Sequence, residues 1–357
     1  MWRFKIKNMR YYLYLFSILF IILTFSNCET IAPPCETAIQ NALLKDKICG
    51  MSLVAPRDPF VQDPMVDMSA LGINWVALIP FGFFDQDSAS IVFDTTGAVG
   101  WWGETKAGIT ASNNLAVAEG VKTMLKPQLW SWKGWIGDME YSTQQEWDDF
   151  HADYINFIFY WARIAEDLDV DIFCIGTEIK KSAINHPIYW RNLIDSVRQV
   201  YSGPITYAPN WDEYEQITFW DRLDYIGVDA YFSLLPDATP RVCDLKTAWE
   251  PTFEHLKTFS KHWNRPVLFT EWGYLSLDGC AYQTWELEKN RSRASINEQA
   301  QANAAQALLE LFGKEDWWAG GFQWKWYSDL ATSTQDRSDD YTPQGKITAD
   351  VLKALYE

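Results

Sequence analysis

The chain has few of the residues that bind metal ions. Only 4 of its 357 residues are histidines and only 6 are cysteines. The cysteines form no Cys-x-x-Cys pair, which excludes a zinc ribbon and a thioredoxin-type motif. The histidines follow no metal-ligand spacing and are expected on solvated faces; they are His151, His186, His255 and His262. An acidic run at Asp336–Asp340 is explained as a polar loop rather than a calcium site. We therefore expect no required metal.

Motifs that bind nucleotides or build a serine nucleophile are also missing. No Gly-x-Gly-x-x-Gly follows the first predicted strand, and no phosphate loop or Gly-x-Ser-x-Gly is present. These absences argue against a dinucleotide cofactor, a nucleotide-dependent enzyme and an esterase. The sequence predicts no cofactor.

Positive charge is scarce. Lys and Arg number 30 against 47 Asp and Glu, which gives a formal net charge of −17. Four of the positive charges and no negative ones lie in residues 1–27, so a chain without that segment would carry −21. Such a surface repels nucleic acids and polyanionic glycans, and a neutral ligand is favoured.

The N-terminus has the pattern of an export signal. Basic residues precede an apolar run, Tyr11–Phe25, which is shorter than the about 20 residues of a membrane span but fits a secretory signal. Cys28 follows this run and resembles a bacterial lipoprotein cleavage site, with Asn27 where a small residue is usual. We expect a lipoprotein-type signal peptide (1–27), a tether (28–45) and a folded domain (46–357). The protein would be exported as a monomer, anchored to the outer membrane by a lipid on Cys28 and facing the periplasm or the cell surface. A soluble secreted form and an uncleaved anchor are the alternatives.

Export would allow the remaining cysteines to oxidise. Cys243 and Cys280 fall in predicted loops after neighbouring strands, and Cys35 lies close to Cys49 in the sequence. These two pairings are the candidates, although sequence does not determine connectivity. Cys174 lies inside a predicted strand and is expected as a free core residue.

Apolar strand-like runs alternate with helical patterns along the chain. Strands are expected at Ile48–Leu53, Asn74–Ile79, Lys122–Leu129, Asp171–Ile175, Ile205–Ala208, Tyr225–Val228, Val267–Thr270 and Gly321–Trp324. Thr143 and Ser295 each open a Ser/Thr-x-x-Glu capping box before a helix, and further helices are expected at Tyr189–Tyr201, Trp249–Trp263 and Ala349–Tyr356. Eight strand–helix units predict an α/β fold, a single (β/α)8 barrel.

Two of the predicted strands end in the same dipeptide, Thr-Glu. Glu178 follows the fourth strand and Glu271 the seventh. In a (β/α)8 barrel the C-terminal strand ends meet at one mouth, where active sites are built. Two carboxylates at one mouth suit glycoside hydrolysis, in which one protonates the leaving oxygen and the other attacks the sugar or activates water.

Polar and aromatic side chains follow most of the other strands. The chain has 20 tryptophans, more than packing alone normally requires. Indole rings stack on sugar rings, while amides and carboxylates bind hydroxyl groups. The candidate sugar-binding residues are Lys126, Gln128, Trp130, Trp132, Thr177, Asn210, Trp211, Asp229, Tyr231, Trp272, Trp324 and Trp326. Trp101 and Trp102 are read as a rim platform or a loop anchor.

The order of these strand ends resembles glycoside hydrolase family 113. The motifs are Ile-Gly-Thr-Glu, Ala-Pro-Asn-Trp, Ile-Gly-Val-Asp-Ala-Tyr, Phe-Thr-Glu-Trp-Gly-Tyr and Trp-Lys-Trp. That family contains β-1,4-mannanases and belongs to a clan of retaining (β/α)8 glycosidases. The resemblance implies Glu178 as acid/base, Glu271 as nucleophile and Tyr231 as the hydrogen-bond partner of the nucleophile. It further implies that Asn210 and Trp211 line the cleft and that Trp324 or Trp326 forms its floor.

One position departs from the pattern of the wider clan. Thr177 stands where the clan commonly has an Asn that binds the sugar 2-hydroxyl.

We expect a retaining hydrolase of neutral β-1,4-mannan-type chains. The alternatives are a non-catalytic glycan-binding lipoprotein, a hydrolase of β-glucan, and an exo-mannosidase whose cleft is closed by residues 275–294.

Overall fold

The computed structural model describes residues 39, 43–93, 100–328 and 335–357. The expected signal segment, the lipidation site Cys28 and the candidate disulfide residue Cys35 lie outside this part of the chain. No helix in the described part is long and apolar enough to cross a membrane.

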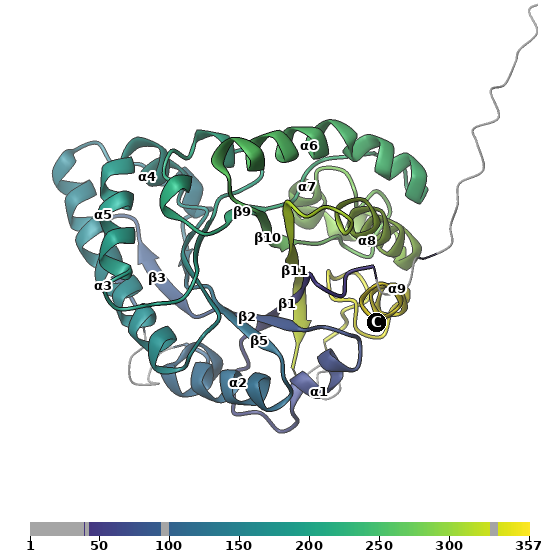
Figure 1. The fold of residues 1–357 in the computed structure, drawn as a ribbon, viewed down its shortest axis with the longest axis horizontal. Coiled ribbons are helices and arrows are strands. Elements are labelled where there is room, and N and C mark those ends of the chain that lie inside the picture. Colours follow the sequence, from purple (N-terminus) through teal and green to yellow (C-terminus); the bar gives the residue numbers. More distant parts are fainter. Residues whose placement is uncertain (1–38, 40–42, 94–99, 329–334) are drawn as a thin grey trace, which may run out of the picture. The chain divides into compact units, whose positions relative to one another are not determined.

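Eight parallel strands form the central sheet, in the order β8-β7-β5-β2-β1-β11-β10-β9. They are β1 (Ile48–Val54), β2 (Trp75–Leu78), β5 (Lys122–Leu125), β7 (Ile172–Thr177), β8 (Ile205–Ala208), β9 (Ile226–Asp229), β10 (Val267–Trp272) and β11 (Trp318–Tyr327). A parallel bridge between Asn210 and Asp229 joins the two outermost strands. The sheet is therefore nearly closed into a barrel, and Figure 1 shows it as a ring with helices around it. The expected (β/α)8 fold is confirmed.

Helices cover the outside of the barrel, and a small second sheet extends from it. The α-helices are α1 (Pro64–Ser69), α2 (Lys106–Ala118), α3 (Gln144–Asp167), α4 (Lys180–Asn185), α5 (Pro187–Val197), α6 (Val242–Trp263), α7 (Thr284–Lys289), α8 (Glu298–Phe312) and α9 (Ile347–Tyr356). Short 3-10 turns are η1 (Trp102–Glu104), η2 (Ile136–Asp138), η3 (Tyr214–Gln216), η4 (Trp220–Arg222) and η5 (Arg291–Arg293). The second sheet contains β4 (Ser90–Val92), β3 (Phe81–Asp85) and β6 (Gln128–Ser131), in that order.

Helix capping agrees with the sequence in one case and differs in another. Thr143 caps α3, because its hydroxyl accepts from the Glu146 amide while Glu146 accepts from the Thr143 amide. The second capping box, which began at Ser295, is wrong. Asn297 caps α8 instead, with its side-chain oxygen accepting from the Ala300 amide at 2.9 Å. Asparagine caps helices as well as serine does, and Asn297 lies directly before Glu298, the first residue of α8.

The third predicted strand is divided at Pro127. Residues before it pair with β2 in the barrel, whereas residues after it form β6 and pair with β3 of the small sheet. Proline has no N–H to donate, so the ladder is interrupted at this residue. Gln128 and Trp130 therefore belong to the small second sheet rather than to the barrel wall.

Several cysteine and histidine predictions differ from the structure. Cys49 and Cys280 carry free, buried thiols, so neither candidate disulfide is formed, and Cys243 is itself disulfide-bonded. Cys174 is a free, buried residue, as predicted. His151 is buried rather than solvated. Its ring stacks on Tyr189 at 3.8 Å, because the position faces helix α5 rather than solvent.

The seam between β8 and β9 generates a stability prediction. Gly227 lies so close to β8 that an added Cβ would be 2.0 Å from the Tyr207 carbonyl oxygen. We expect Gly227→Ala to lower the free energy of unfolding by about 3 kcal/mol, because backbone must move to relieve the clash. The measurement is urea unfolding followed by fluorescence. Gly120→Ala is the control, since its Cβ would meet nothing within 4 Å and only the positive φ of +71° would cost about 1 kcal/mol. Equal losses in the two variants would contradict this account.

Candidate active site

Both candidate carboxylates follow an irregularity in their strands. The pairing of β7 with β8 shifts register between Cys174 and Thr177, directly before Glu178. The pairing of β10 with β9 shifts between Phe269 and Glu271. Such bulges re-aim the side chains that follow them. Glu178 also has a φ of +54°, an uncommon conformation for a residue with a side chain, and its amide donates to the Ala208 carbonyl at 2.8 Å.

Three donors hold Glu271. The Lys126 ammonium donates to its Oε1 at 2.5 Å, and the Gln128 amide donates to the same oxygen at 2.9 Å. The Tyr231 hydroxyl donates to Oε2 at 2.8 Å. These hydrogen bonds, one of them from a cation, engage both carboxylate oxygens and fix the orientation of Glu271. The Tyr231 contact is the one that the family resemblance implied.

Lys126 is a fully buried cation. Its ammonium lies 3.5 Å from Asp229 Oδ1 as well as against Glu271. Burial opposes the charge on Lys126, but Asp229 and Glu271 outweigh it and raise the pKa of the ammonium. Burial, together with the negative charge of Glu271, raises the pKa of Asp229 well above its ordinary value. Lys126 is therefore held as a cation by the two carboxyl groups that it contacts, Asp229 and Glu271.

Glu178 is in a different environment. The Trp135 indole N–H donates to its Oε2 at 2.5 Å. Burial and the neighbouring Glu271 charge raise the pKa of Glu178 to about 7. A carboxyl that is half protonated near neutral pH can donate a proton and later accept one.

A third carboxyl lies behind Glu178 and was not predicted from the sequence. Glu213 follows β8, is fully buried, and has no hydrogen-bond partner for either oxygen among the described residues. Burial and the Glu178 charge raise its pKa to about 8. Glu213 lies two residues beyond Trp211 in a polar stretch, where carboxylates are normally exposed, so no sequence pattern indicates its burial.

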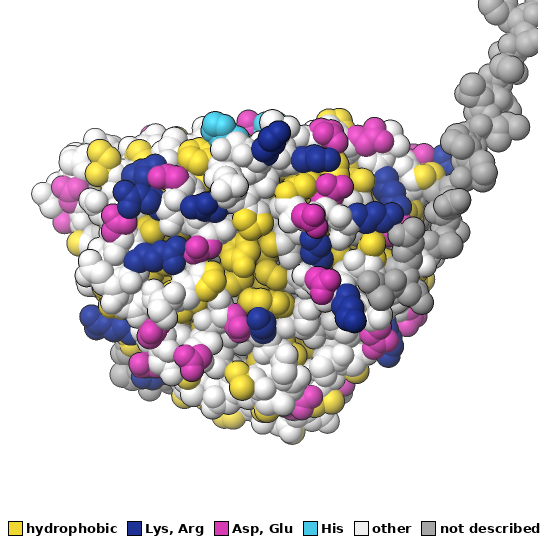
Figure 2. Space-filling view, viewed as in Figure 1, with side chains coloured by type: hydrophobic (Ala, Val, Ile, Leu, Met, Phe, Trp, Pro, Cys, Tyr) yellow, Lys and Arg dark blue, Asp and Glu magenta, His cyan; other side chains and the backbone are white. Residues whose placement is uncertain are grey.

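The two carboxylates line one pocket of about 790 Å³ at the barrel mouth. The pocket walls combine aromatic rings with polar groups from loops after several strands. Trp211 and Trp285 stack with ring centroids 5.3 Å apart. The lining residues are Trp135, Asp138, Glu178, Asn210, Trp211, Asp212, Tyr231, Glu271, Thr284, Trp285, Glu288, Lys289, Trp324, Lys325 and Tyr341. On the face seen down the barrel, Figure 2 shows central hydrophobic side chains surrounded by charges of both signs.

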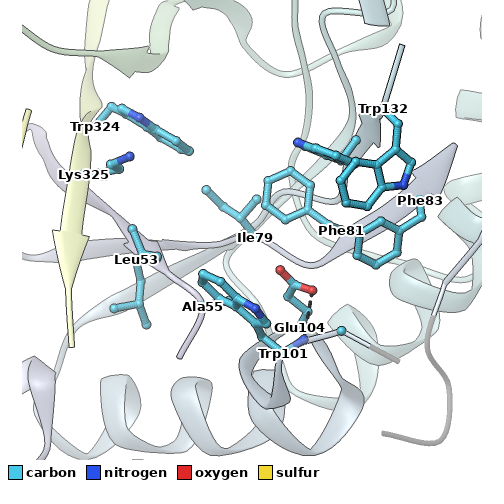
Figure 3. Close-up of a pocket in the computed structure, with 13 residues that line it drawn as sticks. Leu53, Ala55, Ile79, Phe81, Phe83, Trp101, Glu104, Trp132, Trp324 and Lys325 are labelled. Atoms are coloured by element: carbon cyan, nitrogen blue, oxygen red, sulfur yellow. Dashed lines mark hydrogen bonds between the residues drawn. The ribbon is translucent and has the colours of Figure 1, made fainter. Parts of the chain in front are cut away.

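The predicted sugar-binding residues fall into three groups. Asn210, Trp211, Tyr231 and Trp324 line this pocket. Lys126, Gln128 and Asp229 lie beneath it, where they contact Glu271 or one another. Trp130 and Trp132 line a neighbouring pocket of about 510 Å³, in which Trp132 lies on the opposite side from Trp324 (Figure 3).

Trp272, Trp326 and Thr177 differ from the prediction. Trp272 is fully buried, because it points to the opposite side of β10 from its neighbour Glu271. Trp326 is 3% exposed; the register shift of β11 against β1 falls between Trp324 and Trp326 and turns the second indole into the core. Thr177 is buried at the end of β7, paired with Ala208.

Other pocket residues were missed because they come from loops. Trp135 lies beside η2. Trp285 lies on α7, within residues 275–294, which were considered as a loop that closes the cleft. The tryptophan excess was a general signal for them, but no spacing rule marks which loop residues turn inward. Lys325 lies on β11 within the Trp-Lys-Trp motif but was not predicted to line the cleft, and Tyr341 follows no motif.

The described residues hold no group of three His, Cys, Asp or Glu side chains that could bind a metal ion. The pocket instead offers a carboxylate held by a buried ammonium, opposite a carboxyl whose pKa is raised to about 7. This pair suits acid/base chemistry combined with nucleophilic attack.

The buried charge pair generates a stability prediction. Lys126→Met removes the cation and leaves the Glu271 carboxylate uncompensated, so we expect a loss of about 3 kcal/mol in the free energy of unfolding at pH 7. The double variant Lys126→Met/Glu271→Gln should regain most of this loss, because it removes the Glu271 charge together with the cation. Urea unfolding of the wild type, both single variants and the double variant measures the coupling. Additive losses would show that the two side chains do not depend on each other.

Comparisons with known proteins place this geometry in a family. The model of Glycoside Hydrolase Family 113 matches residues 57–346. A family 113 β-mannanase from Alicyclobacillus acidocaldarius superposes with a TM-score of 0.73 at 24% identity, covering 87% of this chain and 97% of that one. Another family 113 β-1,4-mannanase gives 0.72 at 23% identity, covering 87% and 99%.

More distant enzymes share the barrel. A β-glucuronidase from Ruminococcus gnavus has a TM-score of 0.59 at 14% identity, covering 87% of this chain and 50% of that one. No curated protein sequence matches the chain. The solved structures show the fold, and the family model covers most of the sequence. The chain is therefore a glycoside hydrolase that belongs to family 113.

Proposed function

We propose that the protein is a retaining hydrolase of β-1,4-mannan-type chains, with Glu271 as nucleophile and Glu178 as acid/base. The observation that carries this assignment is the contrast between the two carboxyls. Glu271 is held by a buried ammonium and two further donors, whereas the pKa of Glu178 is raised to about 7. Retention is what membership of family 113 implies, and the contrast matches the two roles that a double displacement requires.

In the first step, Glu271 attacks the anomeric carbon while Glu178 protonates the leaving oxygen. One carboxylate oxygen forms the bond to carbon, and the glycosidic C–O bond breaks with its electron pair leaving on oxygen. Lys126, Gln128 and Tyr231 keep the attacking carboxylate aligned. Trp135 holds Oε2 of Glu178, so Oε1 is the oxygen left to carry the proton.

In the second step, a water molecule replaces the leaving group. Glu178, now ionised, takes a proton from this water, and the oxygen attacks the anomeric carbon as the bond to Glu271 breaks. The product keeps the β configuration, and both carboxyls return to their starting states.

The substrate assignment rests on charge, ring chemistry and the relatives. The net charge of −17 disfavours polyanionic glycans, and the pocket pairs indole rings with hydroxyl-binding groups. The two family 113 structures that superpose with this barrel are described as β-mannanases. A β-glucan substrate would use the same chemistry, and the assay below separates the two.

The test of function is product release from β-1,4-mannan, glucomannan and cellulose. We expect the wild type to cut the mannans, and Glu271→Gln to abolish cutting. Glu178→Gln should reduce the rate by about 10²–10⁴-fold, which is the usual rate enhancement from general acid catalysis. Glu250→Gln, an exposed position on α6, is the matched control and should stay active. Wild type that binds mannan without cutting it would favour a non-catalytic glycan-binding protein, and full activity in Glu271→Gln would remove its assigned role.

The pH dependence follows from Glu178. Because its pKa lies near 7 and the acid form is needed, kcat/KM should fall about tenfold per pH unit above that value. The Trp135 hydrogen bond stabilises the charged form and lowers this pKa. Trp135→Phe keeps the aromatic ring but removes the donor, so the alkaline limb should move to higher pH. A pH–rate profile of both proteins measures the shift. Movement to lower pH would contradict the assignment of Glu178 as the acid.

A further inference from the structure

Helix α4 begins two residues after the proposed acid/base Glu178, and its first residue is Lys180. The Lys180 ammonium donates to Oδ2 of Asp212 at 2.8 Å. It also lies 5.9 Å from the centre of the Trp135 ring, a distance at which a cation attracts the face of an indole. Asp212 and Trp135 both line the catalytic pocket, but they follow different strands, β8 and β6. Lys180 therefore joins two walls of the pocket beside Glu178.

The Trp135 ring lies at the surface of the protein rather than in its core. The residue is 38% exposed, although its indole N–H is the donor to Oε2 of Glu178. The ring packs against the backbone at Gly137, where an added Cβ would lie 2.3 Å from the indole. A partly exposed ring on a loop is not fixed by core packing, so the cation that contacts it contributes to its orientation.

Lys180 remains charged under all conditions in which Glu178 titrates. Burial alone would lower the pKa of Lys180, but the hydrogen bond to Asp212 and the charges of Asp212, Glu213 and Asp138 outweigh burial and raise it. These carboxyls come from the turn after β8 and from η2, so Lys180 faces negative charge on both sides. The contact with the Trp135 ring is therefore a contact with a permanent cation.

The surroundings of Glu178 show how Lys180 can act on it. Burial has the largest effect on the pKa of Glu178 and raises it. The charges of Glu271 and Asp212 raise it further, whereas the Trp135 hydrogen bond and the Lys126 charge lower it. Lys180 contacts two of these four groups, Trp135 and Asp212. It does not belong to the described lining of the pocket, so its effect on the reaction passes through these two partners.

We propose that Lys180 is a positioning residue for the acid/base: it holds the Trp135 indole N–H on Oε2 of Glu178 and balances the charge of Asp212. This inference rests on the proposed function of the catalytic pair. With Lys180 in place, Oε1 of Glu178 is the oxygen that exchanges a proton with the leaving group and with water. Without Lys180, the indole is free to leave Glu178 and the Asp212 charge is uncompensated. Both changes disfavour the ionised form of Glu178.

The first experiment follows the hydrogen bond between Trp135 and Glu178 without turnover. In a proton–nitrogen correlation spectrum of the indole groups, the resonance that disappears in Trp135→Phe belongs to Trp135. In the wild type this resonance should move with pH, with a midpoint of about 7, because Glu178 ionises there. In Lys180→Met the movement should be lost, because the indole no longer follows the carboxyl group.

The second experiment measures pH–rate profiles. Lys180→Met should move the alkaline limb of kcat/KM to higher pH, in the same direction as Trp135→Phe. Because Lys180 acts largely through Trp135, the two shifts should not add, and Lys180→Met should shift the limb less in the Trp135→Phe background than in the wild type.

The third experiment varies the leaving group. The phenolate released from 4-nitrophenyl β-mannobioside needs little protonation, whereas the sugar released from mannohexaose needs the acid. We expect Lys180→Met to slow mannohexaose cleavage about tenfold, a part of the general-acid contribution, and to change the aryl mannobioside rate by less than about twofold. A general loss of structure would slow both substrates equally.

Lys257→Met is the matched control. Lys257 makes the same two kinds of contact on α6, an ion pair with Glu315 at 3.6 Å and an approach of 5.5 Å to the Phe253 ring centre, and it is outside the described lining of the pocket. This variant should keep the wild-type indole titration, pH profile and rates.

Three results would overturn the inference. They are a Trp135 resonance that titrates in Lys180→Met as it does in the wild type, additive shifts of the alkaline limb, and equal slowing of both substrates. A wild type that cleaves neither substrate would contradict the proposed function, and the indole titration would still decide whether Lys180 positions Trp135 on Glu178.

Discussion

The contact between the buried Lys126 ammonium and the Glu271 carboxylate is the interaction on which the site depends. Lys126 has no solvent exposure, and it lies between Glu271 and Asp229 at the base of the pocket. Burial is the largest cause of the raised pKa values of Asp229, Glu178 and Glu213, and neighbouring carboxylates raise them further. Lys126 contacts Glu271 directly, whereas Glu178 has, among the described side chains, only the Trp135 indole as a hydrogen-bond donor. The two carboxyls therefore have the different environments that a double displacement requires.

The backbone at the strand ends makes this contact possible. β5 ends at Leu125, directly before Lys126 and Pro127, and Gln128 begins β6 of the small sheet, so Lys126 and Gln128 reach Glu271 from two different sheets. Register shifts in β7 and β10 then present Glu178 and Glu271 to the same pocket. The mouth thus combines a rigid barrel with local departures from regular pairing. These departures are concentrated where the chemistry takes place, as strained or bulged backbone often is.

The sequence predicted the barrel well because each strand is a short apolar run bounded by turn residues. β8 agrees to the residue with the expected Ile205–Ala208, and all eight expected strands are present. Glu178 and Glu271 could be named because strand ends converge in this fold. Side-chain direction could not be predicted in the same way. The shift in β11 hides Trp326, and simple alternation hides Trp272 behind Glu271. Trp135 and Trp285 come from the segments that connect strands to the following helices of the barrel, and the paths of these segments depend on packing that no local pattern encodes.

Direct labelling of the nucleophile tests the central claim. A β-mannobiosyl fluoride with fluorine in place of the 2-hydroxyl of the reacting sugar slows breakdown of a glycosyl-enzyme more than its formation. After incubation with the enzyme, peptide mass spectrometry locates the attached sugar. The account predicts one adduct, on the peptide that contains Glu271. An adduct on Glu178 or on another residue, or an unlabelled enzyme that still hydrolyses mannan, would contradict it.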